Sequence, residues 1–234
     1  MNGRVLVMCA SRGRPERLAE MIESAENTST HADIAVYVDE DQSADYAQVP
    51  GKYRLFTGPR VGQCWGLNHI AKEMPGYEAY GAATDDSRFL TPGWDQWVLR
   101  TASGFKGGIG VLAPYWDKEC NRMDFPWATA KWVETAGSFT CLKTYHSYWD
   151  VALQILGEAT QCAFAGPDDF SMWHAELLPG DAKEKQLNDV GRLVHLLYHV
   201  HNDARITCVW LAREKQAMIE KLRAAIGGDV HAVL

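Results

Sequence analysis

The first 115 residues alternate apolar runs with segments of helical periodicity. Residues 4–10 (RVLVMCA) form a near-continuous apolar run, which is typical of a strand in a parallel sheet covered on both faces. Helical periodicity follows over 11–29, where Pro15 suits a first helical turn and Ser11 is a candidate cap. Further strands are expected at 32–39, 52–56, 77–84 and 107–114, and further helices at 61–74 and 92–103. This alternation predicts an α/β fold with a doubly wound, mostly parallel sheet.

The second half of the chain is less regular. We expect a loop rich in aromatic residues at 122–137, a strand at 138–145 and a helix at 147–157 that ends at Gly157. A helix is expected to begin at Asp168-Asp169, followed by a strand at 191–203 and a terminal amphipathic helix at 209–228. We expect one domain, divided into parts at 1–115, 116–203 and 204–234.

Composition limits the classes of protein. The six cysteines are scattered without a CxxC pair and no signal peptide is apparent, which predicts reduced thiols in a cytosolic protein. No run approaches the roughly 20 apolar residues of a membrane span. The net charge of −7 disfavours tight non-specific binding to a polyanion, although residues 204–226 carry five basic and two acidic side chains.

Polar motifs follow three of the expected strands. They are Ser11-Arg12-Gly13-Arg14, Asp39-Glu40-Asp41 and Asp85-Asp86. In open α/β sheets, ligands bind outside the carboxyl ends of the strands. The three motifs therefore predict a binding site at this edge.

Asp85 and Asp86 allow two interpretations. Adjacent carboxylates repel each other unless a cation or strong donors offset the repulsion, and Mg²⁺ or Mn²⁺ with diphosphate oxygens commonly does so. A capped turn is the alternative, with an Asp or Ser87 capping the helix that opens at Pro92. The position of the pair after an apolar strand favours the cation.

Other motifs also have two interpretations. His199 and His201 lie on one face of an expected strand, and could ligate a metal or be bonded locally. Asp168-Asp169 could supply a general base or cap a helix. The arginines of SRGRP suit a diphosphate or form a solvated turn, and the chain lacks both GxGxxG and GxxxxGK[ST].

Four tryptophans surround the irregular middle of the sequence. They could stack on a sugar or an acceptor, or simply fill the core. They are Trp116, Trp127, Trp132 and Trp149.

Taken in order, these segments resemble nucleotide-sugar glycosyltransferases of the GT-A fold, in particular family-2-like enzymes and their small phage-encoded relatives. The matching stretches are VLVMCASRGRPERL, VYVDED, VGQCWGLNHIAKEMPGYEAYGAATDDSRFLTPGW, AGPDDF and GRLVHLLYHVHND. Together they cover most of residues 4–203. The resemblance makes 1–115 the nucleotide-sugar-binding half and 116–203 the acceptor and catalytic half.

The resemblance also implies roles for individual residues. Those implied to contact the donor substrate are Ser11, Arg12, Arg14, Asp39, Asn68, Asp85 and Trp94. Asp86 would coordinate Mn²⁺ or Mg²⁺, with His199 or His201 as a further ligand. Asp169, with Asp168 beside it, would be the base. The motif is Thr-Asp-Asp where relatives often have another acid, so the register of Asp85 and Asp86 stays open by one residue.

The implied activity is metal-dependent transfer of a sugar from a nucleotide-sugar to an acceptor hydroxyl, with a UDP-sugar as the expected donor. The resemblance to phage-encoded enzymes suggests a hydroxymethylated pyrimidine in DNA as one acceptor, while a glycan, a small molecule or a protein remains open. Two alternatives stand beside it. A nucleotidyltransferase on a similar fold should show a GxGxRL-type first turn, which SRGRP is not. A non-catalytic nucleotide- or glycan-binding module should bind nucleotide irrespective of metal.

Overall fold

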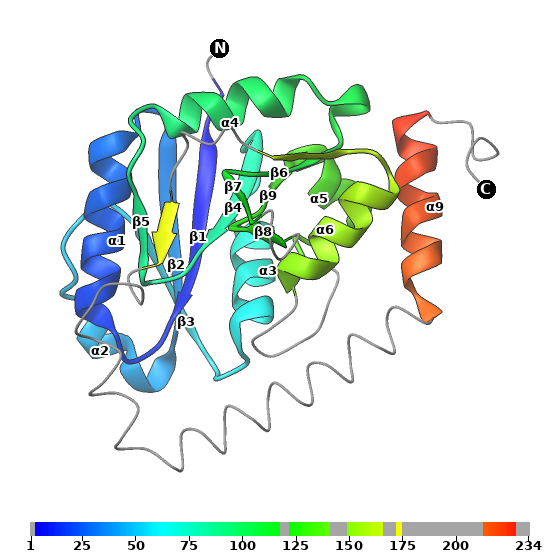
Figure 1. Ribbon diagram of the computed structural model, residues 1–234. Coiled ribbons are helices and arrows are strands. Elements are labelled where there is room, and N and C mark those ends of the chain that lie inside the picture. The colour runs from blue at the N-terminus through cyan, green and yellow to red at the C-terminus, as the bar shows by residue number, and fades with distance from the viewer. Residues whose placement is uncertain (1–2, 118–121, 141–148, 166–171, 175–212, 228–234) are drawn as a thin grey trace.

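A seven-stranded sheet forms the centre of the computed structural model, which describes residues 3–117, 122–140, 149–165, 172–174 and 213–227 (Figure 1). The strand order is β10-β6-β9-β4-β1-β2-β3. All neighbouring pairs are parallel except the two that β9 makes with β4 and β6. The strands are β1 (Val5–Ser11), β2 (Ala32–Asp39), β3 (Arg54–Gly58), β4 (Ala79–Ala83), β6 (Val111–Ala113), β9 (Trp127–Thr129) and β10 (Ala163–Ala165). This is the predicted doubly wound, mostly parallel α/β sheet.

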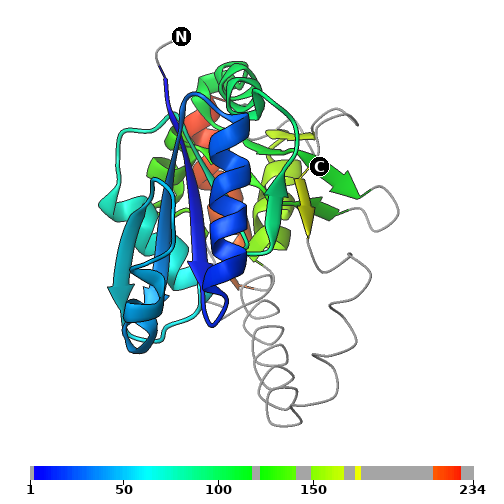
Figure 2. The same ribbon diagram turned by 90° about the vertical axis from the view of Figure 1, so that its left-hand side faces the viewer.

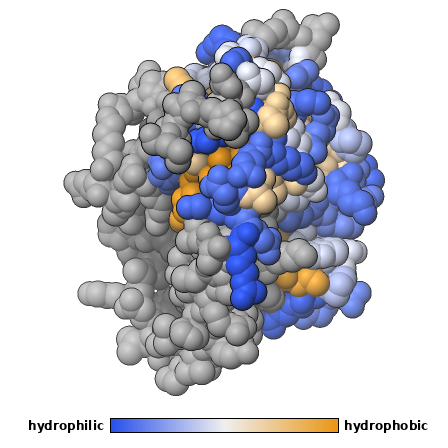
Figure 3. Space-filling model, turned by 90° about the vertical axis from the view of Figure 1, so that its right-hand side faces the viewer, coloured by the Kyte–Doolittle hydropathy of each residue, from blue (hydrophilic) through white to orange (hydrophobic). Residues whose placement is uncertain are grey.

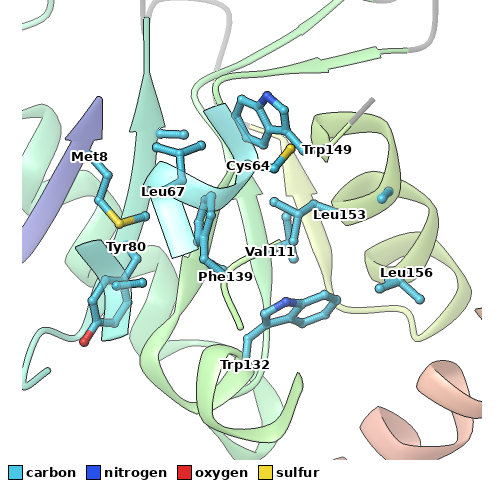
Figure 4. Close-up of a cluster of buried hydrophobic side chains, with 14 of the residues drawn as sticks. Met8, Cys64, Leu67, Tyr80, Val111, Trp132, Phe139, Trp149, Leu153 and Leu156 are labelled. Atoms are coloured by element: carbon cyan, nitrogen blue, oxygen red, sulfur yellow. The ribbon is translucent and has the colours of Figure 1, made fainter. Parts of the chain in front are cut away.

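Helices cover both faces of the sheet. They are α1 (Pro15–Thr28), α2 (Ser43–Tyr46), α3 (Gln63–Glu73), α4 (Trp94–Ser103), α5 (Ala130–Ala136), α6 (Trp149–Ala159) and α9 (Lys215–Ile226), with short 3₁₀ turns η1 (Glu40–Gln42) and η2 (Lys106–Gly108). Alternate residues of β1 explain the two layers. Val5 and Val7 pack with α1 and α4, whereas Leu6 and Met8 pack with α3, α5, α6 and α9. Figure 4 shows this second cluster, which includes Trp132, Phe139 and Trp149.

Two small sheets flank the main one. β5 (Ser87–Phe89) pairs antiparallel with β11 (Met172–His174), and β7 (Tyr115–Asp117) pairs antiparallel with β8 (Arg122–Asp124). β5 follows directly after Asp86 and lies against α1, and Figure 2 shows β11 beside it. The strand pair therefore flanks the end of β4 where the acidic pair lies.

Several predictions about the second half were wrong. The segment 122–137 is β8, β9 and α5 rather than a loop, because Thr129 caps α5 by accepting from the Trp132 amide and β9 pairs on both sides. Gly157 does not end α6, which continues to Ala159, since this glycine packs closely against Ala163. Residues 172–174 are a strand and not part of a helix, because they pair with β5. The strand expected at 191–203 lies outside the described residues.

The terminal helix has the predicted apolar face. Ile219 and Leu222 are buried, and Met218 and Ile226 pack beside them. Seen from the side of α9, the described surface is largely hydrophilic, with a smaller group of apolar residues (Figure 3). Within the described ranges, no helix has both the length and the apolar character needed to cross a bilayer. Among the described residues, Cys9, Cys64 and Cys162 are buried and take part in no disulfide.

Candidate active site

The sheet brings the three polar strand ends to one edge. β1 pairs in parallel with both β2 and β4, with Ser11 opposite Val38 and Cys9 opposite Ala83. The residues that follow each strand therefore leave the sheet side by side. Their side chains contact one another directly, as the hydrogen bonds below show.

Ser11 and Tyr46 hold Asp85 in place. The Ser11 hydroxyl donates to Asp85 Oδ2 at 2.6 Å and lies 2.7 Å from the Tyr46 hydroxyl, which also accepts from the Arg14 amide at 3.0 Å. Ser11 is thus part of the site and does not cap α1, whose N-cap is Arg14. Asp85 is a fixed, buried carboxylate with 1% of its surface exposed.

Arg14 lies between the two carboxylates of the acidic pair. Its guanidinium is 2.9 Å from Asp85 Oδ1 and 3.2 Å from Asp86 Oδ2. Burial raises the pKa of Asp85 above its ordinary value, while Arg14 and the Ser11 hydrogen bond act in the opposite direction. Asp85 and Asp86 do lie in a turn, which the Ser87 amide closes by donating to the Thr84 carbonyl at 3.0 Å, but neither an aspartate nor Ser87 caps α4. Ser87 lies in β5, and the N-cap of α4 is Gly93 without a side-chain bond.

Arg12 links the ends of β1 and β2. It donates to Asp39 at 2.6 Å and to both oxygens of Asp41 at 2.8 and 2.7 Å. The bond to Asp41 raises the pKa of Arg12 and lowers that of Asp41. The neighbouring Gly13 amide donates to the Gln42 side chain at 2.7 Å. The loop after β1 is therefore fastened to the turn after β2.

The carboxylate oxygens of Asp85 and Asp86 are suitable ligands for a divalent cation. Two carboxylates on consecutive residues face a common point, and a guanidinium already lies there, so the position is suited to positive charge. Mg²⁺ and Mn²⁺ take one or two protein carboxylates and complete their coordination with water or phosphate oxygens. In the part of the chain that the structure describes, no group of three or more His, Cys, Asp or Glu side chains could hold a metal.

Two residues implied to bind substrate do not contact this cluster. Asn68 exchanges two hydrogen bonds with the backbone of Thr140, at 3.1 and 2.9 Å, which engages both ends of its amide. Trp94 is 1% exposed, packs between Phe89 and Trp127, and donates to Thr28 at 3.1 Å. We therefore assign both residues to the framework rather than to substrate binding.

The tryptophans of the irregular middle are mainly core residues. Trp127 and Trp132 are 1% exposed and Trp149 is 7% exposed, so stacking on an acceptor does not apply to these three. The side chain of Trp116 lies outside what the structure describes. Asp168, Asp169, His199 and His201 also lie outside the described residues, so their roles stay predictions.

Sequence reasoning missed Tyr46 and Gln42. Both bond to the β1 turn, but they lie in a polar stretch, 42–46, that has no motif. The sequence predicted Asp41 only as part of the Asp39-Glu40-Asp41 motif and gave it no role of its own. Its position just after the end of a strand could have indicated that it contacts the site.

No protein-family model and no curated protein sequence matches this chain. Solved structures do match. A mannosyltransferase from Pyrobaculum calidifontis, in complex with GDP-Man and Mn²⁺, is 12% identical with a TM-score of 0.54, over 99% of this chain and 76% of its own. TarS 1–349 from S. aureus is 9% identical with a TM-score of 0.52, over 74% of this chain.

The chain spans 60% of that TarS structure. A cytidylyltransferase from Leptospira borgpetersenii is 16% identical with a TM-score of 0.46, over 73% of this chain and 77% of its own. At these identities the likeness concerns the fold. With its seven-stranded, mostly parallel sheet, the chain has a mixed α/β architecture that matches the GT-A-like glycosyltransferase folds.

Proposed function

We propose that this protein is a glycosyltransferase that moves a sugar from a nucleotide-sugar donor to an acceptor hydroxyl, and that the donor is a UDP-sugar. The observation that carries the proposal is the cluster at the carboxyl edge of the sheet, where a buried acidic pair meets Arg14 and Ser11. Its position is where open α/β sheets bind ligands, and its groups suit a diphosphate and its cation. The GT-A-like fold supports the same reading.

Each group at the edge has a distinct task in this proposal. Arg12, held by Asp39 and Asp41, positions the base and ribose beside Asp39. Arg14 binds the diphosphate, because a guanidinium matches phosphate oxygens in a bidentate fashion and because Arg14 is the N-cap residue of α1. Asp85 is anchored by Ser11 and orients Asp86.

Asp86 with Asp85 would hold Mn²⁺ or Mg²⁺, with His199 or His201 as a further ligand. Bound there, the cation supplies positive charge to offset the negative charge that builds on the leaving diphosphate.

Asp169, with Asp168 beside it, is the base that we propose for an inverting reaction. It would take the proton of the acceptor hydroxyl. Three residues after Asp169, β11 begins, and β11 pairs with β5 next to the acidic pair. A retaining reaction would need no such base, so the anomeric configuration of the product tests this role.

The experiment that tests the proposed function is turnover of UDP- and GDP-sugars with and without Mn²⁺. We expect metal-dependent release of the nucleoside diphosphate, and a fall of about 10²-fold or more in Asp86→Asn. Asp33→Asn is the control, since Asp33 lies at the opposite end of β2 and pairs with Arg4. Full activity of Asp86→Asn, or nucleotide binding without any turnover, would contradict the proposal; the latter would indicate a binding module.

The acceptor that we propose to test first is DNA that carries hydroxymethylated pyrimidine. The basic side chains of α9 support a polyanionic acceptor, although the whole chain is acidic. Incubation with Mn²⁺ and several sugar nucleotides, followed by digestion and mass spectrometry, should show nucleosides heavier by one hexose or pentose. An unchanged mass with every donor would remove this acceptor.

A further inference from the structure

The positive charge that holds the acidic pair comes from the protein itself. The Arg14 guanidinium contacts one oxygen of each carboxylate, at 2.9 Å from Asp85 and 3.2 Å from Asp86. The side chains of the two aspartates are 1% and 5% exposed, whereas that of Arg14 is 30% exposed. A largely buried pair of negative charges is thus partly offset by a cation that remains in contact with solvent.

A guanidinium and a divalent cation compete for Asp85 Oδ1 and Asp86 Oδ2. Each is attracted to the same carboxylates, and at such short separation the two positive charges would repel each other strongly. Asp85 does not depend on Arg14 for its position, because Ser11 donates to its other oxygen. The backbone of Arg14 is likewise held, because its amide donates to Tyr46, so rotation about the side-chain bonds is enough to move the guanidinium off the carboxylates. The exchange therefore requires only a side-chain movement.

A diphosphate offers Arg14 an alternative partner of the same kind. Guanidinium binds phosphate oxygens as well as carboxylates in two parallel hydrogen bonds. We infer that Arg14 is a displaceable cation, which occupies the place of the divalent metal until a nucleoside diphosphate draws its guanidinium away. Nucleotide and metal then bind together rather than separately. The nucleotide half of this inference rests on the proposed function, and the metal half does not.

The metal half is tested on the full chain without nucleotide. Binding of Mn²⁺ is measured by electron paramagnetic resonance of the free ion, for the wild type, Arg14→Gln and Arg4→Gln. We expect weak binding to the wild type and at least tenfold tighter binding to Arg14→Gln. Arg4→Gln should equal the wild type, because Arg4 pairs with Asp33 just before the other end of β1. Equal affinity of Arg14→Gln and the wild type overturns the inference.

The tighter Mn²⁺ binding of Arg14→Gln must also come from Asp85 and Asp86. Adding Asp86→Asn to Arg14→Gln should return Mn²⁺ binding to the wild-type level or below. A gain that survives in this double variant would place the ion elsewhere and overturn the inference.

Arg14→Gln leaves two buried carboxylates without their guanidinium, so folding is measured in parallel by thermal unfolding. If this variant does not fold, Arg14→Lys takes its place. A lysine keeps one positive charge, but its compact ammonium is more strongly hydrated than a guanidinium and lacks the planar fork that matches carboxylate oxygens. We then expect at least threefold tighter Mn²⁺ binding than in the wild type, and unchanged binding overturns the inference.

The nucleotide half is tested by the coupling between the two ligands. In the wild type, saturating UDP should tighten Mn²⁺ binding at least tenfold, and by reciprocity Mn²⁺ should tighten UDP binding by the same factor. In Arg14→Gln this factor should fall at least threefold, because the competition has been removed. An undiminished factor overturns the nucleotide half.

The two proposals fail in different ways. Tighter Mn²⁺ binding to Arg14→Gln without any turnover of nucleotide-sugars would support Arg14 as a displaceable cation and contradict the proposed transferase activity. Metal-dependent turnover together with equal Mn²⁺ affinity keeps the transferase and removes the displaceable cation.

Discussion

Tyr46 connects two parts of the site through one oxygen atom. Its hydroxyl lies 2.7 Å from Ser11 Oγ and accepts from the Arg14 amide at 3.0 Å. Burial raises the pKa of this phenol above its usual value. Tyr46→Phe should cost about 1 kcal/mol of stability, and more where the freed partners stay unsatisfied. Because Ser11 and Arg14 lose a shared partner, UDP affinity should fall as well, which calorimetry measures.

Tyr77→Phe is the matched control for this prediction. The Tyr77 hydroxyl donates to Asp33 at 2.8 Å, and burial and this bond raise its pKa to about 12. Asp33 lies at the amino end of β2, whereas the site lies beyond its carboxyl end. The two variants should lose similar stability in urea, and only Tyr46→Phe should lose nucleotide affinity. Equal affinities would show that Tyr46 has a structural role alone.

At the scale of single residues, position along the chain predicted part of the site. Ser11, Arg14, Asp39 and Asp85-Asp86 could be predicted because they follow apolar runs, and parallel strands carry such residues to one edge. Tyr46 could not, since a helix of four residues has no detectable periodicity and its partners lie 32 and 35 residues away. Trp94 follows the acidic pair in sequence, but the turn at Gly93 directs it into the core.

The length of each helix or strand determined whether it could be predicted from the sequence. β1, β2 and α1 have seven residues or more, and their apolar patterns were sufficient to place them. β5, β8 and β9 have three residues each, too few for a period of two to be distinguished from a loop. β9 in addition runs antiparallel between β4 and β6. Its place depends on partners that are distant in sequence.

Gly81 of β4 shows why β9 fits there. A Cβ at Gly81 would lie 2.1 Å from the ring of Trp127 in β9, and this ring is fully buried. Gly81→Ala should therefore force the two strands apart and destabilise the protein by about 2 kcal/mol or more. Thermal unfolding measures the loss. Because β4 leads directly to the acidic pair, UDP affinity should fall at temperatures where the variant is still folded.

Gly104→Ala provides the comparison. Gly104 ends α4 with φ −83°, and its nearest new contact would be 3.4 Å away, which is an ordinary separation. An alanine there should change stability by less than about 1 kcal/mol, in the stabilising direction. If Gly81→Ala were as mild as Gly104→Ala, β9 would not be packed against β4 as described.

For the molecule as a whole, stability and the site depend on different layers. α9 packs with α5, α6 and η2 on the face of the sheet that also carries α3, and α1 lies on the other face (Figure 1). The acidic pair is held mainly by the turn after β1 and by α2. A cavity created under α9 should thus weaken the fold without altering the contacts of the site.

Leu222→Ala tests this separation. Leu222 is fully buried, and its truncation should cost about 2–5 kcal/mol, whereas Lys221→Ala on the exposed side of α9 should cost less than about 0.5 kcal/mol. UDP with Mn²⁺ at 100 times the dissociation constant should stabilise the wild type by about 2.7 kcal/mol. Leu222→Ala should keep this increment in full, because its binding site is intact, and chelation of the metal should remove most of it from every variant. A smaller increment in Leu222→Ala, measured by calorimetry below its unfolding transition, would mean that α9 is coupled to the donor site after all.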